Sequence, residues 1–465
     1  MRKEYTKIKK IESSIIEVEK VSDIAYNSLV SVHAEGMEFV GSVVMVNDDT
    51  VTIEVYANTD NFSIDDIVVS FHEKPLELPL NENILGRTFN GIGEPIDNGG
   101  DIYSDETYPV EGLALNPVAR EYPRDFIQTG ISAIDTLTTL IRGQKLPIFS
   151  GSGLPHNEIA AQIIRQAKLK TDEDFAFVFA AMGIKKDEAM FFEDAFSKAG
   201  VKDKLVMYQN LADSPIMERL LAPKCALTAA EYLAYKKGYH VLVIITDMTS
   251  YCEALREVSS IRGEIPSRKG YPGYLYSNLA SLYERAGMIE GVKGSVTLIP
   301  ILTMPNDDIT HPVPDLTGYI TEGQIVIDRG LSSKGVYPPI NVLPSLSRLM
   351  KDGIGEGYTR ADHEDVMNQL YESYSKVIDV RNIAQIVGEE DLSEIDKKYL
   401  EFGEVFENKF LAQGQNENRE LEESLDLAWD ILKILPRTEL HRVSEKNLDK
   451  FIGKIDEQWR YSKQG

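Results

Sequence analysis

The chain has 465 residues, a length typical of roughly two to four domains, and its 43% hydrophobic and 26% charged residues are those of a globular protein. Its formal net charge of −25 repels phosphate backbones, which argues against a broad nucleic-acid-binding surface. No apolar run approaches the roughly 20 residues that span a bilayer, and no apolar core region follows the basic start. We therefore expect a cytoplasmic protein without direct membrane insertion. Neither Cys225 nor Cys252 stands at a metal-ligand spacing, so no metal site is expected.

The first part of the chain predicts strands and the last part predicts helices. Residues from about 12 to 72 hold short Val- and Ile-rich stretches between turn signals, which favours a small β-barrel. Residues 82–103, rich in Gly, Pro and Asn, predict a connecting loop. From about 125 to 350, apolar strands alternate with helical patterns, which is typical of a mostly parallel sheet covered on both faces. From about 355 only amphipathic helices are predicted, and Ser393 with Asp396 can form a capping box.

A glycine-rich turn between a strand and a helix is the first candidate for a ligand site. It lies in LPIFSGSGLPHNEIAAQIIRQA, residues 146–167. This is the layout of a phosphate-binding loop, whose pattern G-x-x-x-x-G-K-[ST] supplies a lysine to the phosphates and a hydroxyl to magnesium. Gly151 and Gly153, on either side of Ser152, allow the backbone to approach an anion at the start of the helix.

The residues that hold a nucleotide are missing from this loop. Ser150 and Pro155 stand in the places of the two glycines, His156 in that of the lysine and Asn157 in that of the Ser/Thr. Histidine is mostly neutral near pH 7, and the missing charge-assisted contact is typically worth about 1.5–3 kcal/mol. The loop therefore indicates weak nucleotide binding or a plain strand–turn–helix connection, and it argues against hydrolysis.

Three further positions bear on the same chemistry. The apolar strand YHVLVIITDMT ends near Asp247, which fits the position that holds magnesium through water in P-loop ATPases, or simply caps a turn. Ile184, after the strand DFAFVFAAM, stands where an ATPase needs a carboxylate to activate water. By residue type alone, Arg348 in NVLPSLSRLMKDG is a solvated charge, an ion-pair partner or a functional cation. These positions predict the frame of a nucleotide site without its catalytic groups.

Three long stretches resemble the B subunit of archaeal/vacuolar-type (A/V-type) rotary ATPases: FIQTGISAIDTLTTLIRGQKLPIFSGSGLPHNE, PDLTGYITEGQI and LPSLSRL. The resemblance covers nearly the whole chain and implies a multidomain α/β fold. We expect an N-terminal β-barrel at residues 1–74 and a central RecA-like, P-loop-type α/β nucleotide-binding domain at residues 75–354. A C-terminal α-helical bundle is expected at residues 355–465.

In this family, three catalytic A subunits and three B subunits alternate in an A3B3 ring around a rotating shaft, and B is the non-catalytic, regulatory member. The resemblance implies ATP or ADP with Mg at the A/B interface, bound mainly by the A subunit, and weak or no nucleotide in this chain's own loop. It also implies central shaft and peripheral stalk partners, and a peripheral location on the cytoplasmic side of the membrane. The ring couples ATP hydrolysis or synthesis to proton or sodium transport.

By the same resemblance, Arg348 matches the arginine that reaches across the interface into the partner's ATP site. Such an arginine finger is worth about 10³–10⁵ in rate in P-loop systems. Ser347 and Arg262 are weaker interface candidates, and Arg262 can equally be a loop arginine held by local acids. GEEDLSEIDKKY, residues 388–399, resembles the acidic helix–turn by which ring subunits touch the shaft, or is a solvated helix start. Its acids are Glu389, Glu390, Asp391, Glu394 and Asp396.

Two other functions are weighed against this interpretation. A self-sufficient ATPase needs a lysine at position 156 and a carboxylate near position 184, and the chain has neither. A RecA-like ring translocase acting on nucleic acid predicts a basic channel, which the net charge of −25 and the acidic residues 389–396 oppose.

Overall fold

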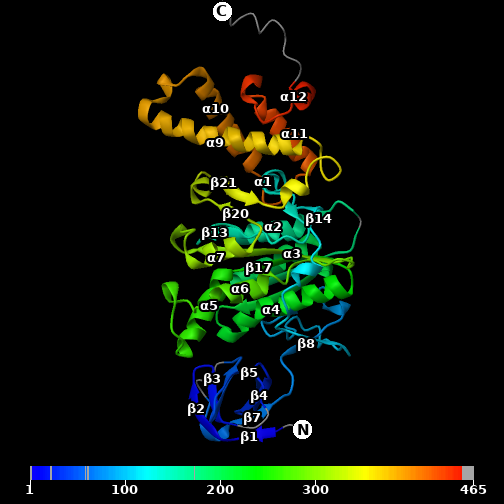
Figure 1. The fold of residues 1–465 in the computed structure, drawn as a ribbon, viewed down its shortest axis with the longest axis vertical. Coiled ribbons are helices and arrows are strands. Elements are labelled where there is room, and N and C mark those ends of the chain that lie inside the picture. Colours follow the sequence, from blue (N-terminus) through cyan, green and yellow to red (C-terminus); the bar gives the residue numbers. More distant parts are fainter. Residues whose placement is uncertain (1–2, 21–23, 58, 60–61, 172, 453–465) are drawn as a thin grey trace, which may run out of the picture. The chain divides into compact units, whose positions relative to one another are not determined.

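The computed structural model describes residues 3–20, 24–57, 59, 62–171 and 173–452 (Figure 1). Its internal contacts divide the chain into two compact units, each of which is described by itself. The first unit consists of Met1–Glu121, Asp174–Thr303 and Thr310–Ile320, and the second of Tyr122–Glu173, Met304–Ile309 and Thr321–Gly465. The three domain limits expected from the sequence stay a prediction.

The first unit begins with a curved antiparallel sheet, drawn in blue in Figure 1. The strand order is β1-β7-β4-β5-β6-β3-β2, so the expected N-terminal β-domain is present as a half-barrel with β1 and β2 as its end strands. Inward-facing residues alternate along the strands, as Ile16 and Val18 do opposite Ile53 and Val51, and all four are fully buried. The strands are β1 (Lys3–Tyr5), β2 (Ile8–Glu12), β3 (Ile15–Glu19), β4 (Leu29–Ala34), β5 (Met37–Val46), β6 (Thr50–Val55) and β7 (Val68–Phe71).

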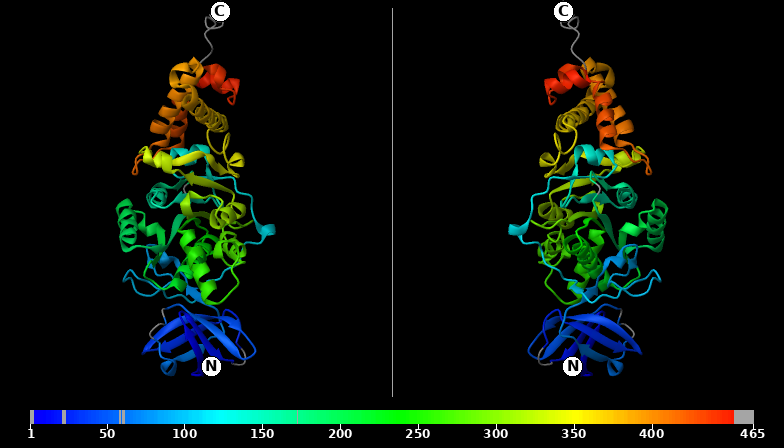
Figure 2. Two further views of the ribbon diagram at one scale, coloured as in Figure 1. Left: turned by 90° about the vertical axis from the view of Figure 1, so that its left-hand side faces the viewer. Right: turned by 90° about the vertical axis from the view of Figure 1, so that its right-hand side faces the viewer.

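A parallel sheet follows in the first unit, with the order β19-β17-β15-β16-β9. Its long strands are mostly apolar and almost entirely buried, as is typical of parallel strands covered by helices. From β15 through α3 to β16 the chain crosses the sheet in one direction, and from β16 through α4 to β17 in the other. Right-handed crossovers therefore place α3 and α4 on opposite faces, and helices flank the strands on both sides in Figure 2.

The elements of this sheet and its cover have the following bounds. The strands are β9 (Thr88–Phe89), β15 (Phe175–Ile184), β16 (Leu205–Leu211), β17 (His240–Thr246) and β19 (Ser295–Met304), with β18 (Gly287–Met288) antiparallel to β19. A separate short pair consists of β8 (Glu77–Pro79) and β10 (Thr107–Pro109). The helices are α3 (Lys186–Ala199), α4 (Ile216–Glu231), α5 (Met248–Ile261), α6 (Leu275–Tyr283) and α7 (Pro312–Ile320).

In the second unit, the strand and helix on either side of the predicted loop are both present. Strand β13 (Ile148–Gly151) pairs in parallel with β20 (Gly323–Ile327), which pairs antiparallel with β21 (Ile340–Ser347). A second small sheet has the order β12-β11-β14. Its strands are β11 (Phe126–Gln128), β12 (Leu140–Ile141) and β14 (Lys168–Leu169). The helices of this part of the unit are α1 (Ser132–Leu137), α2 (His156–Gln166) and α8 (Arg329–Ser333).

The C-terminal part of the second unit is a helical bundle, as expected. Its core includes a stack of Phe402, Phe406 and Phe410, spaced four residues apart, with Tyr374 packed on Phe406. The expected capping box is only half formed. The Ser393 hydroxyl accepts the N–H of Asp396, but it also donates to the Asp396 carboxylate, whereas a box would direct that carboxylate to the Ser393 backbone. The helices are α9 (His363–Val387), α10 (Glu394–Val405), α11 (Leu421–Leu432) and α12 (Glu445–Phe451).

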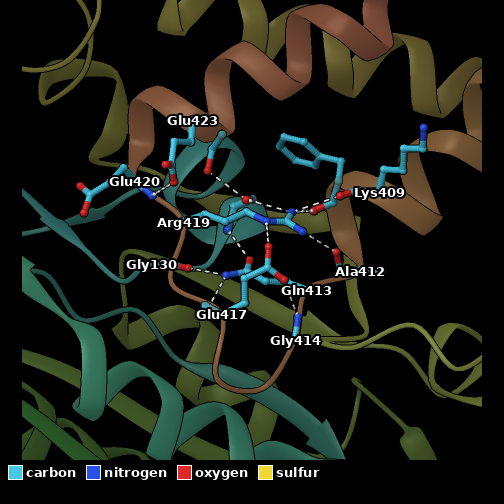
Figure 3. A network of polar contacts seen from close by, with 12 residues as sticks. Gly130, Lys409, Ala412, Gln413, Gly414, Glu417, Arg419, Glu420 and Glu423 are labelled. Atoms are coloured by element: carbon cyan, nitrogen blue, oxygen red, sulfur yellow. Dashed lines mark hydrogen bonds and ion pairs between the residues drawn. The ribbon is translucent and has the colours of Figure 1, made fainter. Parts of the chain in front are cut away.

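A polar loop attaches this bundle to the start of α1 within the same unit (Figure 3). The Gln413 amide donates to the carbonyl of Gly130 at 2.6 Å and accepts the N–H of Ser132 at 3.1 Å. The Arg419 guanidinium donates to the carbonyl of Ala412 at 2.9 Å and to those of two further residues. Because these hydrogen bonds are directional and end on backbone groups, they hold the loop in a fixed position against the start of α1.

Candidate functional site

The turn after β13 has the path of a phosphate-binding loop but a different set of contacts. Gly151 is buried, Ser152 and Gly153 are exposed, and Gly153 has a φ of +77°, a conformation that favours glycine. Helix α2 begins at His156, whose Nδ1 lies 3.1 Å from the buried Ser150 hydroxyl. His156, which stands in the place of the phosphate-binding lysine, is thus hydrogen-bonded to Ser150, which stands in the place of the first glycine.

A bidentate ion pair from two other segments lies against this turn. Arg329, the first residue of α8, pairs with Asp307 through Nε at 2.7 Å and Nη2 at 2.9 Å, and Nη2 also donates to the Ser152 carbonyl at 3.0 Å. The hydrogen bond from Arg329 lowers the pKa of the Asp307 carboxyl. A Cβ added to Gly151 would lie 2.2 Å from Asp307 Oδ1. This pair could not be predicted from the sequence, because its members are 22 residues apart and far from the loop along the chain. The glycine at position 151 is the one local sign of it.

Asp247, in the first unit, acts as a helix cap in this structure. Its Oδ1 accepts the N–H of Thr249 at 2.8 Å and that of Thr303 at 3.1 Å, and its Oδ2 accepts the Thr303 hydroxyl at 2.5 Å. The carboxylate that could hold magnesium through water is therefore already bonded by its own chain. The end of β15 offers no replacement: Ile184 is buried, and the nearby Glu188 bonds the Lys185 N–H at the start of α3.

Arg262, also in the first unit, is held by acids of this chain. Its Nη2 lies 2.6 Å from Glu54 Oε2 on β6, and its Nη1 lies 3.8 Å from Glu264 Oε1. Glu54 is almost fully buried, and burial raises the pKa of its carboxyl even beside the guanidinium. These contacts describe a structural ion pair, and a part for Arg262 in an interface stays a prediction.

Arg348, in the second unit, follows the last residue of β21 and is exposed. Its N–H donates to the carbonyl of Glu322 at 2.9 Å, and its guanidinium Nη1 donates to the Thr321 carbonyl at 3.3 Å. Within the described residues, this guanidinium forms no ion pair. Ser347 is buried beneath it: its hydroxyl donates to the Thr139 carbonyl at 2.9 Å. The backbone is fixed, and the exposed guanidinium makes one long hydrogen bond to its own chain within the described residues.

The acidic segment lies at one end of α9 and α10. Glu389–Asp391 form a single 3-10 turn after Gly388, and Glu394 and Asp396 occupy the first turn of α10. A groove of about 850 Å³ runs beside them. It is lined mainly by charged residues, namely Arg381, Glu389, Glu390, Lys397, Glu401 and Glu404. The apolar side chains of Ile383, Ile386 and Val387, near the end of α9, are exposed.

Two features of the described residues concern metals and membranes. No group of three or more His, Cys, Asp or Glu side chains there could hold a metal ion. None of the helices there combines the length and hydropathy needed to cross a bilayer. Both cysteines are buried, and burial raises the pKa of the Cys225 thiol to about 12.

The parallel sheet and the strand–turn–helix around Gly151 define an α/β protein with the fold of a nucleotide-binding domain, and comparison with known proteins identifies its kind. Residues 130–347 match the nucleotide-binding domain of the ATP synthase alpha/beta family, and residues 352–452 match the C-terminal domain of V and A type ATP synthase. Arg348 lies in the short gap between the two matches.

Relatives along the whole chain agree. The V-type ATP synthase beta chain 2 of Clostridium tetani is 61% identical, with 97% of this chain and 99% of the relative covered. The B subunit of the A-type ATP synthase of Aeropyrum pernix is 56% identical, with 97% of each covered. The solved structure of the ATP synthase subunit NeqB from Nanoarcheaum equitans is 39% identical, with a TM-score of 0.71, 90% of this chain and 98% of that chain covered. The chain belongs to the family of V-type ATP synthase beta chains and A-type ATP synthase B subunits.

Proposed function

We propose that this chain is the non-catalytic, regulatory B subunit of an A3B3 head and supplies Arg348 in trans to the ATP site of a catalytic A subunit. Family membership supports a place in an ATP-driven ion-transporting complex and favours it over a nucleic-acid translocase. The finer assignment, that this chain lends a cation and does no hydrolysis itself, is argued from the residues of the site.

The observation that carries the proposal is the state of the Arg348 guanidinium. An arginine that only stabilised the fold would bond a carboxylate or several carbonyls of its own chain, as Arg419 does. Arg348 instead has a fixed backbone and an exposed end that touches one carbonyl at 3.3 Å. A guanidinium held this way can approach the charge that develops on a phosphoryl group in a neighbouring site.

The chain's own loop supports the non-catalytic half of the proposal. His156 supplies no fixed charge, Asp247 is bonded to Thr249 and Thr303, and Ile184 cannot activate water. Backbone N–H groups at the start of α2 can still attract an anion, so the loop suits weak nucleotide binding at most. The ATP or ADP and its Mg would then be held mainly by the A subunit, with Arg348 reaching the phosphates.

The acidic end of α9 and α10 is proposed as the contact with the rotating shaft. Of the groove's cations, Arg381 pairs with Glu407 at 2.5 Å and Lys397 pairs with Glu394 at 3.0 Å. Neither cation therefore neutralises Glu389 or Glu390, which also line the groove. Excess carboxylates beside exposed apolar side chains suit a shaft helix that carries Lys or Arg next to an apolar stripe. The head, with its peripheral stalk, would lie on the cytoplasmic side of the membrane and drive proton or sodium transport there.

Reconstitution tests the proposed division of labour. Phosphate release from ATP is measured for three samples: the purified chain alone, a purified A subunit alone, and the mixture of the two. We expect a hexamer with ATPase activity only in the mixture. Brisk turnover by this chain alone would contradict the proposal, and full turnover by the A subunit alone would show that no residue is supplied in trans.

A further inference from the structure

A buried lysine lies beneath the strand end that carries Arg348. The Lys145 side chain is 3% exposed, and its Nζ lies 2.7 Å from Glu322 Oε1. The backbone N–H of Lys145 donates to the other oxygen, Oε2, at 2.8 Å. One residue therefore binds both oxygens of the Glu322 carboxylate, which is 29% exposed and could otherwise turn to another cation.

Arg348 is a second cation close to Glu322. Strands β20 and β21 pair Gly323 with Ser347, so one further step along the register places Glu322 opposite Arg348. The Arg348 N–H bonds the Glu322 carbonyl at 2.9 Å, and its guanidinium touches the carbonyl of the preceding residue, Thr321. Opposite residues of an antiparallel pair have Cβ atoms about 4.5–5.5 Å apart, well within the combined reach of Glu and Arg side chains.

An Arg348–Glu322 ion pair would be harmful to an arginine finger. Guanidinium and carboxylate pair in a bidentate way, and a finger held by its own chain is less available to a phosphoryl group in a partner. The ends of β20 and β21 cannot move apart to prevent such a pair, because Gln144 links them. Its amide donates to the Glu322 carbonyl at 3.0 Å and to the Ser347 hydroxyl at 2.9 Å. Only the side chains can change partners.

We propose that Lys145 is a positioning residue that keeps Arg348 free by holding the Glu322 carboxylate away from it. The inference rests on the proposed role of Arg348 as the trans-acting cation.

The test measures ATPase kinetics of rings reconstituted with the A subunit. Lys145→Met removes the Nζ contact and leaves only the backbone N–H of residue 145 on the Glu322 carboxylate. The oxygen that Nζ held is then available to Arg348, so kcat falls by about tenfold or more while KM for ATP changes little. The double variant Lys145→Met with Glu322→Gln has no carboxylate to capture the finger, and kcat returns to within about threefold of wild type. Lys145→Arg, which still binds Glu322, keeps most of the activity.

A purely structural role for Lys145 predicts a different pattern, in which the second substitution leaves kcat as low as before. That result, or full activity of Lys145→Met, would overturn the inference. If the Lys145→Met ring does not assemble, Lys145→Gln replaces it, since glutamine keeps a neutral donor in the same place. The kcat of Lys145→Gln is then compared with that of the double variant Lys145→Gln with Glu322→Gln, and the same recovery is expected. Arg348→Ala is measured alongside. An active Arg348→Ala ring removes the proposed function itself, whereas an inactive one beside an active Lys145→Met removes only this inference.

Discussion

Arg329 and Asp307 form a bidentate ion pair against the turn after β13, and the same guanidinium donates to the Ser152 carbonyl. The pair lies so close to Gly151 that a methyl group there would meet Asp307 Oδ1 at 2.2 Å and Arg329 Nη2 at 2.8 Å. The loop is therefore shaped by side chains of its own chain as well as by its glycines.

Gly151→Ala tests this packing. Because the added methyl must displace the ion pair or the turn, we expect a loss of about 1–3 kcal/mol in the free energy of unfolding, measured by denaturant titration. Gly273→Ala is the matched control, since nothing lies within 4 Å of a Cβ at that exposed position and its φ is not in the left-handed region. Equal stability of the two variants would show that the pair moves away without cost.

Restoring the lysine separates binding from hydrolysis. His156→Lys supplies the charge-assisted contact that the loop lacks, so the affinity of the purified chain for Mg-ATP should rise by about tenfold in calorimetric titrations. Phosphate release should stay absent, because Ile184 provides no carboxylate to activate water. His441→Lys, at an exposed position, adds the same charge elsewhere and should change neither quantity. Release of phosphate by His156→Lys would contradict the assignment of Ile184.

His363 makes the stability of the chain fall in mild acid. Its Nε2 donates to the Thr136 carbonyl at 2.9 Å and its Nδ1 lies 3.0 Å from the Thr359 hydroxyl, a pattern that suits the neutral ring. Burial lowers the pKa of His363 to about 4, while the unfolded chain titrates near 6.5.

Between those two values the unfolded state binds a proton that the folded state excludes. Stability from His363 is therefore complete above about pH 6.5 and is lost as the pH falls toward 4, by roughly 3 kcal/mol in all. Urea unfolding of wild type and His363→Gln at pH 7.5 and pH 5 measures the effect. The variant should lose less stability than wild type over that step, and an equal loss would place the pH dependence elsewhere.

The acidic end of α9 and α10 should matter for coupling and not for chemistry. Neutralising Glu389, Glu390 and Asp391 to their amides removes charge from exposed positions, so the fold and the ATPase rate of the isolated head should hold. Ion transport per ATP, measured in vesicles with the whole complex, should fall. Unchanged coupling would favour the simpler interpretation of these acids as a solvated helix start.

Strands and helices of both units could be predicted because the spacing of apolar residues along the sequence reflects which side of each element is buried. The apolar run of β17 and the strand–turn–helix around Gly151 were found this way, and the loop's missing lysine was visible from position 156 alone. The partners of Arg262 and Ser152 could not be found, because Glu54 and Arg329 are brought to them by folding over about 180–210 residues of chain. The capping box at Ser393 failed for a smaller reason: its hydroxyl bonds the carboxylate that should have capped the backbone.

The central claim is that Arg348 acts in a neighbour's reaction. The most direct measurement is single-turnover ATP hydrolysis by A–B rings containing Arg348→Ala, with Arg442→Ala, an exposed arginine paired with Glu372, as the control. The account predicts that both variants assemble, that Arg442→Ala hydrolyses ATP at the wild-type rate, and that Arg348→Ala is slower by about 10³-fold or more. Near-normal hydrolysis by the Arg348→Ala ring would contradict it.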